Sequence, residues 1–69
     1  MAKGIYRKRM GEIRRGDVVA GAAEGWWRVT SVDHDRGSGT VVLFCTNTVT
    51  GRAGELYGNA HDFRDLVAL

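Results

Sequence analysis

The 69-residue chain is predicted to form one small all-β domain. Its apolar residues fall in short runs rich in valine and aromatic side chains, which are typical of strands. Polar segments that contain glycine separate these runs, as turns separate the strands of a β-meander. These two observations lead us to expect short strands joined by tight turns.

Three longer strands are expected first. The first covers 13–20, with a turn or bulge at Gly16-Asp17, and the loop GAAEG follows it. The second covers 26–33 and the third covers 40–46, the run with the strongest strand composition. The intervening HDRGSG is a hairpin turn, because its two glycines can adopt positive φ.

Shorter elements complete the expected domain. After a polar turn at 47–54, a fourth strand covers 55–58. Residues 60–66 suit one helical turn, because Asp62 and Asp65 are favoured at turn and cap positions. The last three residues are expected to form a short closing strand.

The N-terminal segment differs from the rest in charge. Six of the ten basic residues lie in the first fifteen positions, opposed only by Glu12, whereas four basic residues face seven acidic ones from Gly16 onward. Residues 1–12 can be a flexible arm or an additional edge strand. We therefore divide the chain into a basic N-terminal arm, 1–12, and a folded domain, 13–69.

The order of the expected elements resembles that of the small SH3-like barrels. IRRGDVV is similar to the opening strand of KOW-type and translation-factor-type barrels, where a Gly-Asp pair precedes two apolar residues. WWRVTSVDHDRGSGTVVL is similar to their central hairpin, and DFRDLVAL to their turn and last strand. The resemblance implies a five-stranded SH3-like barrel with one short helical turn before its last strand. An OB-like barrel is the alternative fold.

Strand parity predicts which side chains are buried. Neighbouring side chains point to opposite faces of a strand, so Trp27 is expected in the core and Trp26 outside it, unless a bulge at Trp26 exchanges them. Val29 and Val32 do not share parity, which predicts a bend or bulge near Thr30-Ser31. The predicted core comprises Val18, Trp27, Val29, Val32, Val41, Leu43, Cys45, Leu56, Phe63, Leu66 and Val67.

The sequence predicts a non-enzymatic binding module. Cations beside aromatic side chains suit nucleic acid, because the cations contact phosphates and the rings stack on bases. Either DNA or RNA fits this pattern, and no membrane partner is expected. The predicted nucleic-acid-binding residues are Lys3, Tyr6, Arg7, Lys8, Arg9, Arg14, Arg15, Trp26 and Arg28.

A protein–protein adaptor is the alternative function. Trp26 would then anchor an interface with a second copy or a partner, because tryptophan is enriched at interfaces. Alternatively, Trp26 caps an open end of the barrel, is covered by the arm, or stacks on a base or ligand. Eight arginines against two lysines, with abundant Gly, Ala and Val, are typical of high-GC genomes such as actinobacteria and their phages, so a small phage-encoded component fits this alternative.

No cofactor, metal or catalytic residue is expected. His34-Asp35 and His61-Asp62 match no zinc-ligand spacing, and no Ser or Cys nucleophile is placed with them by a known motif. Cys45 is the one cysteine, so no internal disulfide can form, and it is expected to be buried. A single free cysteine fits the reducing cytoplasm, or the host cytoplasm for a phage protein. No apolar run approaches the roughly 20 residues needed to span a bilayer.

Overall fold

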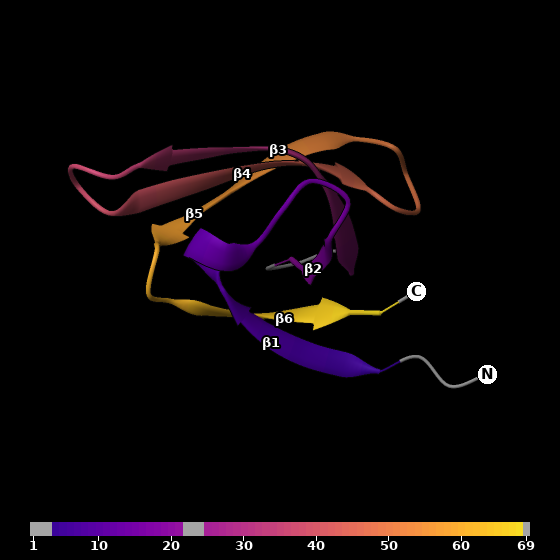
Figure 1. The fold of residues 1–69 in the computed structure, drawn as a ribbon. Coiled ribbons are helices and arrows are strands. Elements are labelled where there is room, and N and C mark those ends of the chain that lie inside the picture. The colour runs from indigo at the N-terminus through magenta and orange to yellow at the C-terminus, as the bar shows by residue number, and fades with distance from the viewer. Residues whose placement is uncertain (1–3, 22–24, 69) are drawn as a thin grey trace.

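The computed structural model describes residues 4–21 and 25–68 of the chain. The described residues are all-β, with one 3₁₀ turn (Figure 1). Their elements, in chain order, are β1 (Ile5–Arg9), η1 (Met10–Glu12), β2 (Val18–Ala20), β3 (Trp26–Asp35), β4 (Thr40–Asn47), β5 (Ala53–Asn59) and β6 (Phe63–Val67).

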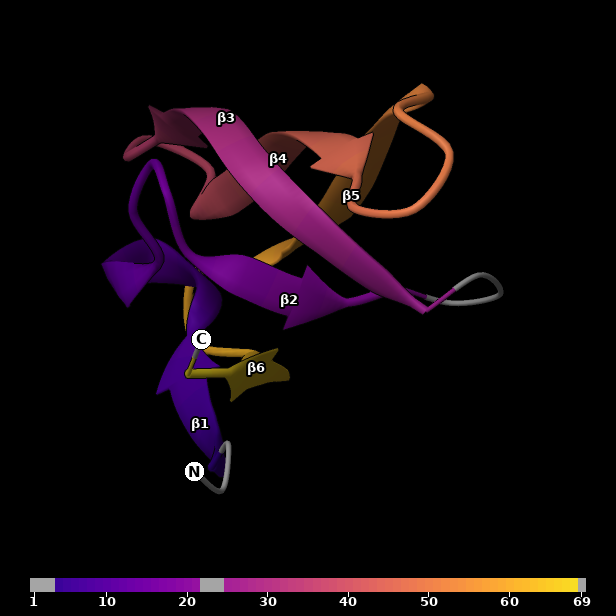
Figure 2. The same ribbon diagram turned by 90° about the vertical axis from the view of Figure 1, so that its right-hand side faces the viewer.

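The strands form one antiparallel sheet in the order β1-β6-β2-β3-β4-β5. The sheet is open, with β1 and β5 at its edges. It also bends strongly, so that β3, β4 and β5 lie above β1 and β6 in Figures 1 and 2, with η1 between the two layers. Backbone hydrogen bonds from Met10 N to Asp62 O (2.8 Å) and from Gly11 N to Ala60 O (3.1 Å) tie η1 to the β5–β6 turn.

The expected helical turn before the last strand is wrong. Residues 60 and 61 form a simple turn, and the strand β6 begins at Phe63, while the only helical turn among the described residues is η1. Asp62 acts locally as expected of a turn residue, because its Oδ2 accepts a hydrogen bond from Asn59 N (3.0 Å). The chain is extended beyond it because β6 pairs with β1 on one side and with β2 on the other.

Residues 1–12, for which the sequence allowed either a flexible arm or an additional edge strand, contain β1. All five residues of β1 pair with β6, from Ile5 opposite Val67 to Arg9 opposite Phe63. Met10 follows β1 and is completely buried over Gly58 of β5, where an added Cβ would collide with the Met10 sulfur. The end of this segment therefore contributes to the main core.

The central hairpin agrees with its prediction. β3 pairs with β4, and the register shifts between Val29, which lies opposite Cys45, and Ser31, which lies opposite Phe44. The extra residue is Thr30, whose hydroxyl donates to the carbonyl of Phe44 (2.9 Å). The bulge confirms the predicted bend and lets both Val29 and Val32 contact the core.

Most of the predicted core is confirmed. Val18, Val29, Val41, Leu43, Cys45 and Leu66 are buried, and Trp27, Val32 and Leu56 pack against the core in part. The prediction for Phe63 is wrong, because this residue is 54% exposed on the face opposite to that of Leu66. Val67 is half-buried and does not belong to the core cluster. Three buried hydrophobic residues were missed, namely Met10, Ile13 and Val19.

The two tryptophans have different surroundings. Trp27 packs against the core between Gly21 and Gly54, and an added Cβ at either glycine would collide with its indole. Trp26 is half-buried, and its carbonyl accepts hydrogen bonds from the backbone N and the hydroxyl of Thr48 (both 3.0 Å).

Within residues 4–21 and 25–68, no helix is long and apolar enough to cross a membrane.

Candidate nucleic-acid interface

The predicted cations of β1 already have partners within the protein. Arg7 Nε lies 3.1 Å from Asp65 Oδ1 in an ion pair whose side chains are 70% and 52% exposed. Arg9 donates from Nη1 to the carbonyl of His61 (3.3 Å), and its guanidinium lies 4.6 Å from the centre of the Phe63 ring. The ion pair between Arg7 and Asp65 is weak because both side chains are exposed. Lys3, which was also predicted to bind nucleic acid, lies outside the described residues.

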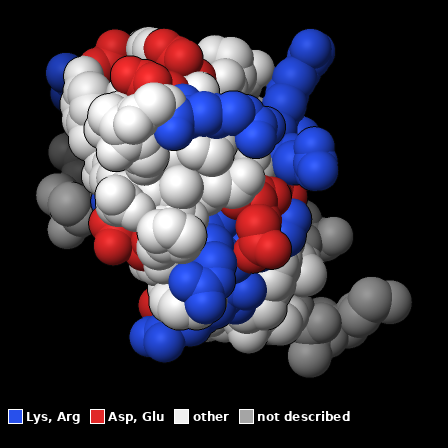
Figure 3. Space-filling view, turned by 60° about the vertical axis from the view of Figure 1, so that its left-hand side comes forward, with Lys and Arg blue, Asp and Glu red and all other residues white. Residues whose placement is uncertain are grey.

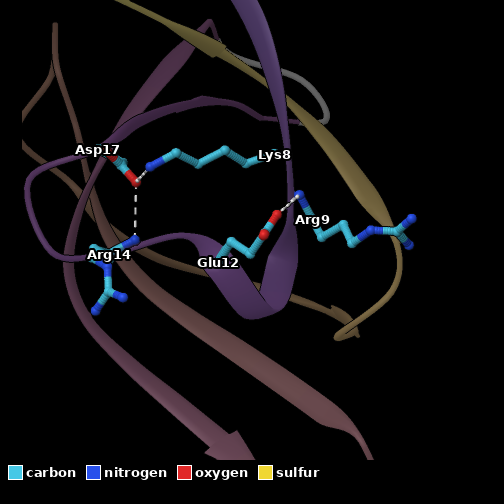
Figure 4. A network of polar contacts seen from close by, with 5 residues as sticks. All are labelled: Lys8, Arg9, Glu12, Arg14 and Asp17. Atoms are coloured by element: carbon cyan, nitrogen blue, oxygen red, sulfur yellow. Dashed lines mark hydrogen bonds and ion pairs between the residues drawn. The ribbon is translucent and has the colours of Figure 1, made fainter.

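Lys8 belongs to a less exposed polar network (Figure 4). Asp17 Oδ2 accepts hydrogen bonds from Lys8 Nζ (3.1 Å) and from the backbone N of Arg14 (2.9 Å). The side chains of Lys8 and Asp17 are only 32% and 19% exposed. Because this pair joins β1 to the loop before β2, we assign Lys8 a structural role in the unbound protein.

This network predicts that two carboxylates, both paired with β1 cations, contribute unequally to the free energy of unfolding. Replacing Asp17 with alanine should lower the free energy of unfolding by about 1–3 kcal/mol, because a half-buried lysine and a backbone N–H lose their acceptor. Replacing Asp65 with alanine should change it by less than about 0.5 kcal/mol, because the Arg7 pair is solvated. Urea unfolding followed by tryptophan fluorescence measures both, and equal losses would contradict the assignment.

Arg14 and Arg15 are positioned differently from the β1 cations. The preceding Ile13 is buried in the core, and Gly16 turns the chain with a φ of 96°. Both arginine side chains are exposed as a result. In Figure 4 the Arg14 guanidinium points away from Asp17, so Arg14 contacts this carboxylate through its backbone N and not through its side chain.

These two arginines line a shallow groove of about 440 Å³ against β3 and the hairpin tip. Arg36 and His34 line the same groove, and no Asp or Glu of the described part of the chain is among its lining residues. The guanidinium groups of Arg14, Arg15 and Arg36 form no ion pair with any described residue. We call this surface the arginine groove and define it by its basic residues and by the two hydroxyl-bearing residues at the β3 bulge. These are Arg14, Arg15, Thr30, Ser31, His34 and Arg36.

The surface beside the groove carries both signs of charge. Figure 3 views the side of the molecule on which the β3–β4 hairpin tip and η1 lie, and its Lys and Arg side chains gather in two groups with acidic side chains between them. Asp35 is the last residue of β3, and its Oδ1 accepts a hydrogen bond from Gly37 N of the hairpin turn (2.9 Å). That bond, with those from Ser38, lowers the pKa of Asp35 below its ordinary value.

Arg36 and His34 were missed as site residues. They become neighbours of Arg14 and Arg15 through the antiparallel register, in which Val18 lies opposite Arg28 and Gly16 N donates to Val29 O (2.8 Å). Following this register further places the end of β3 beside residues 11–15. The length of the central hairpin in the sequence was the one signal that could have indicated this contact.

The remaining predicted residues lie away from the arginine groove. Tyr6 and Arg28 line a second pocket together with Gly16 and Asp17. Trp26 begins β3 and lines neither cavity. The structure therefore separates the eight predicted residues that it describes into paired β1 cations, a groove, a pocket and a half-buried tryptophan.

The titratable residues outside these sites show no arrangement for metal chemistry. Within the described ranges, no three His, Cys, Asp or Glu side chains gather closely enough to hold a metal ion. Cys45 is buried, its Sγ donates to the carbonyl of Leu43 (3.4 Å), and burial raises the pKa of its thiol. Such a thiol is a poor nucleophile because little of it is ionised at neutral pH.

Comparison with known proteins adds no family. Scans against protein-family models, curated proteins and solved structures each found no match to the chain.

Proposed function

We propose that this protein is a non-enzymatic nucleic-acid-binding module and that its arginine groove contacts the phosphate backbone. The observation that carries the proposal is a set of three arginines that form no ion pair within residues 4–21 and 25–68. They line a groove with no acidic side chain among its described lining residues. Guanidinium groups bind phosphate through paired N–H donors, and hydroxyl groups such as that of Ser31 can donate to phosphate as well. DNA and RNA both present this backbone.

We also propose that the fold is a small SH3-like barrel with one additional edge strand. The order β6-β2-β3-β4-β5 supports this assignment, because it is the order that a five-stranded SH3-like meander has when its last strand returns beside its first. β1 then lies outside β6 as a sixth strand.

Exposure favours nucleic acid over the adaptor function. Trp26, which would anchor a protein interface, is half-buried, whereas the three groove arginines are exposed. A phosphate backbone needs accessible cations, and a protein anchor needs an accessible aromatic side chain.

The proposal predicts binding that depends steeply on salt. A fluorescein-labelled oligonucleotide should bind at about 50 mM salt and dissociate as the concentration rises, because each phosphate contact contributes a log–log slope of roughly −0.7 on single strands or −0.9 on duplex. Replacing Arg14, Arg15 and Arg36 together with alanine should lower the affinity at about 50 mM salt and reduce the slope by about two to three phosphate contacts. Fluorescence anisotropy at several salt concentrations measures the affinity and the slope.

A matched pair of variants separates the groove from net charge. Arg36→Ala and Arg52→Ala remove the same charge from exposed arginines, but Arg52 lies in the β4–β5 connection and does not line the groove. We expect Arg36→Ala to reduce the slope by about one phosphate contact and Arg52→Ala to leave it unchanged. Equal effects, or no binding at about 50 mM salt, would overturn the proposal. An oligomer that Trp26→Ala disperses would then support the adaptor.

A further inference from the structure

A second pocket includes Gly16 and Asp17, which directly follow the groove arginines in the chain, among its lining residues. It has a volume of about 280 Å³, and residues of four strands line it, namely Tyr6 of β1, Val18 of β2, Arg28 of β3 and Val67 of β6. Small-molecule sites start at about 300 Å³, so a cavity of this size suits one ring system and not an extended ligand.

The pocket combines an apolar base with two planar side chains. Val18 is only 3% exposed although it does not belong to the main core cluster, which places this side chain beneath the pocket as an apolar surface. Tyr6 is 39% exposed, and Arg28 is exposed as well. Within the described residues, neither the Tyr6 hydroxyl nor the Arg28 guanidinium has a hydrogen bond or an ion pair.

Planar groups that have no partner in the protein can stack on a planar ligand. An aromatic ring stacks on the face of any nucleobase, and an arginine guanidinium adds a stacking surface and a cation–π attraction. Asp17 also lines the pocket, and its Oδ2 already accepts hydrogen bonds from Lys8 Nζ and Arg14 N. Its charge is therefore compensated by Lys8 and does not exclude a nucleotide.

The pocket adjoins the arginine groove along the chain. Arg15 lines the groove and Asp17 lines the pocket, and two residues span at most about 7 Å of extended chain. Asp17 also binds the backbone of Arg14, so one hydrogen-bonded loop shapes both cavities. A nucleic-acid strand that crosses this loop can place phosphates on Arg14 and Arg15 and one base in the pocket.

We infer that the pocket between Tyr6 and Arg28 binds a single nucleobase by stacking, which makes single-stranded nucleic acid the ligand of this face. The inference rests on the proposed function. A base inside a duplex is stacked and paired, so it can enter the pocket only after the costly step of flipping out of the helix. A single strand presents its bases without that cost.

The test compares three probes of equal length at about 50 mM salt by fluorescence anisotropy. These are a ten-nucleotide oligothymidylate, an abasic ten-mer with the same phosphates, and a ten-base-pair duplex. The wild-type protein should bind the oligothymidylate roughly tenfold more tightly than the abasic strand, because one stacked base adds to the phosphate contacts. The abasic strand reports on the phosphate contacts alone.

Variants of Tyr6 and Arg28 test whether these two side chains cause the preference for strands that carry bases. Tyr6→Leu keeps an apolar side chain without a ring and should abolish the preference for bases, whereas Tyr6→Phe should retain it. Arg28→Lys keeps the charge but loses the plane, so it should reduce the preference and leave the salt dependence unchanged. Circular dichroism confirms that each variant is folded, and the exposed Arg28 provides the test if a Tyr6 variant is not.

The outcomes distinguish this inference from the proposed function. If wild-type protein binds all strands equally, or Tyr6→Leu and Arg28→Lys leave the preference intact, the pocket does not bind a base, although the groove still binds phosphate. If Tyr6→Leu weakens the base-carrying and abasic strands to the same extent, its effect is not stacking and the inference is overturned. If no probe binds, the proposed function fails together with it.

Discussion

A chain that begins at residue 13 is expected to be largely unfolded at 25 °C. This truncation removes β1, which pairs with β6 along its whole length, and Met10, which is completely buried over Gly58. Loss of a buried methionine side chain alone costs about 2–5 kcal/mol. The core of a domain below about 70 residues rarely supplies more than 3–5 kcal/mol in total. Far-UV circular dichroism and urea unfolding of the full and shortened chains measure the effect.

Two substitutions separate the core contact from strand pairing. Met10→Ala should lower the free energy of unfolding by about 2–5 kcal/mol, because it leaves a cavity against β5. Met10→Leu conserves volume and should cost less than about 1.5 kcal/mol. If the chain that begins at residue 13 unfolds cooperatively at the same urea concentration as the full chain, residues 1–12 are a separable arm and β1 has no role in stability.

Gly54→Ala is expected to destabilise the protein strongly through Trp27. A Cβ at residue 54 would lie 2.7 Å from Cζ3 of the indole and 3.0 Å from Cη2, closer than carbon atoms approach one another. The ring is rigid and packs against the core, so relief requires movement of the backbone or of the tryptophan. We expect a loss of about 1–3 kcal/mol, in the range of overpacked cores. Urea unfolding followed by circular dichroism measures this loss without relying on tryptophan fluorescence.

The matched control for this substitution is Gly4→Ala. No atom lies within 4 Å of a Cβ at residue 4, so alanine there should be neutral or stabilise by up to about 1 kcal/mol through the unfolded chain. A double-mutant cycle with Trp27→Leu tests the mechanism, because the smaller side chain makes room for the new methyl group. If Gly54→Ala costs the same with leucine at residue 27, the loss does not arise from the indole.

The central hairpin was the part of the fold that the sequence predicted best. Its two strands are adjacent in the chain, and their side chains alternate between faces with a period of two, so Val41, Leu43 and Cys45 could be placed inside directly. The mismatch between Val29 and Val32 predicted the bulge for the same reason. Such inferences need only the chain within one hairpin.

The ends of the chain were predicted less well. The segment that contains Phe63 and Leu66 has the spacing of a helical turn, but pairing with β1 and β2 on its two sides makes it a strand. In a strand these two residues face opposite ways, which exposes Phe63 and places it under Arg9. The partner strands come from the beginning of the chain, so no local pattern around residue 63 could indicate the pairing.

The sequence alone determined that the protein is all-β, where its central hairpin turns, and that its positive charge is concentrated near the N-terminus. Only the tertiary structure decided which cations remain available. Lys8 and Arg7 meet carboxylates from other elements, while Arg14 and Arg15 meet Arg36 in a groove whose described lining residues include no Asp or Glu. The physical reason is that strand periodicity depends on neighbouring residues, whereas charge pairing depends on the register of strands that are distant in the sequence.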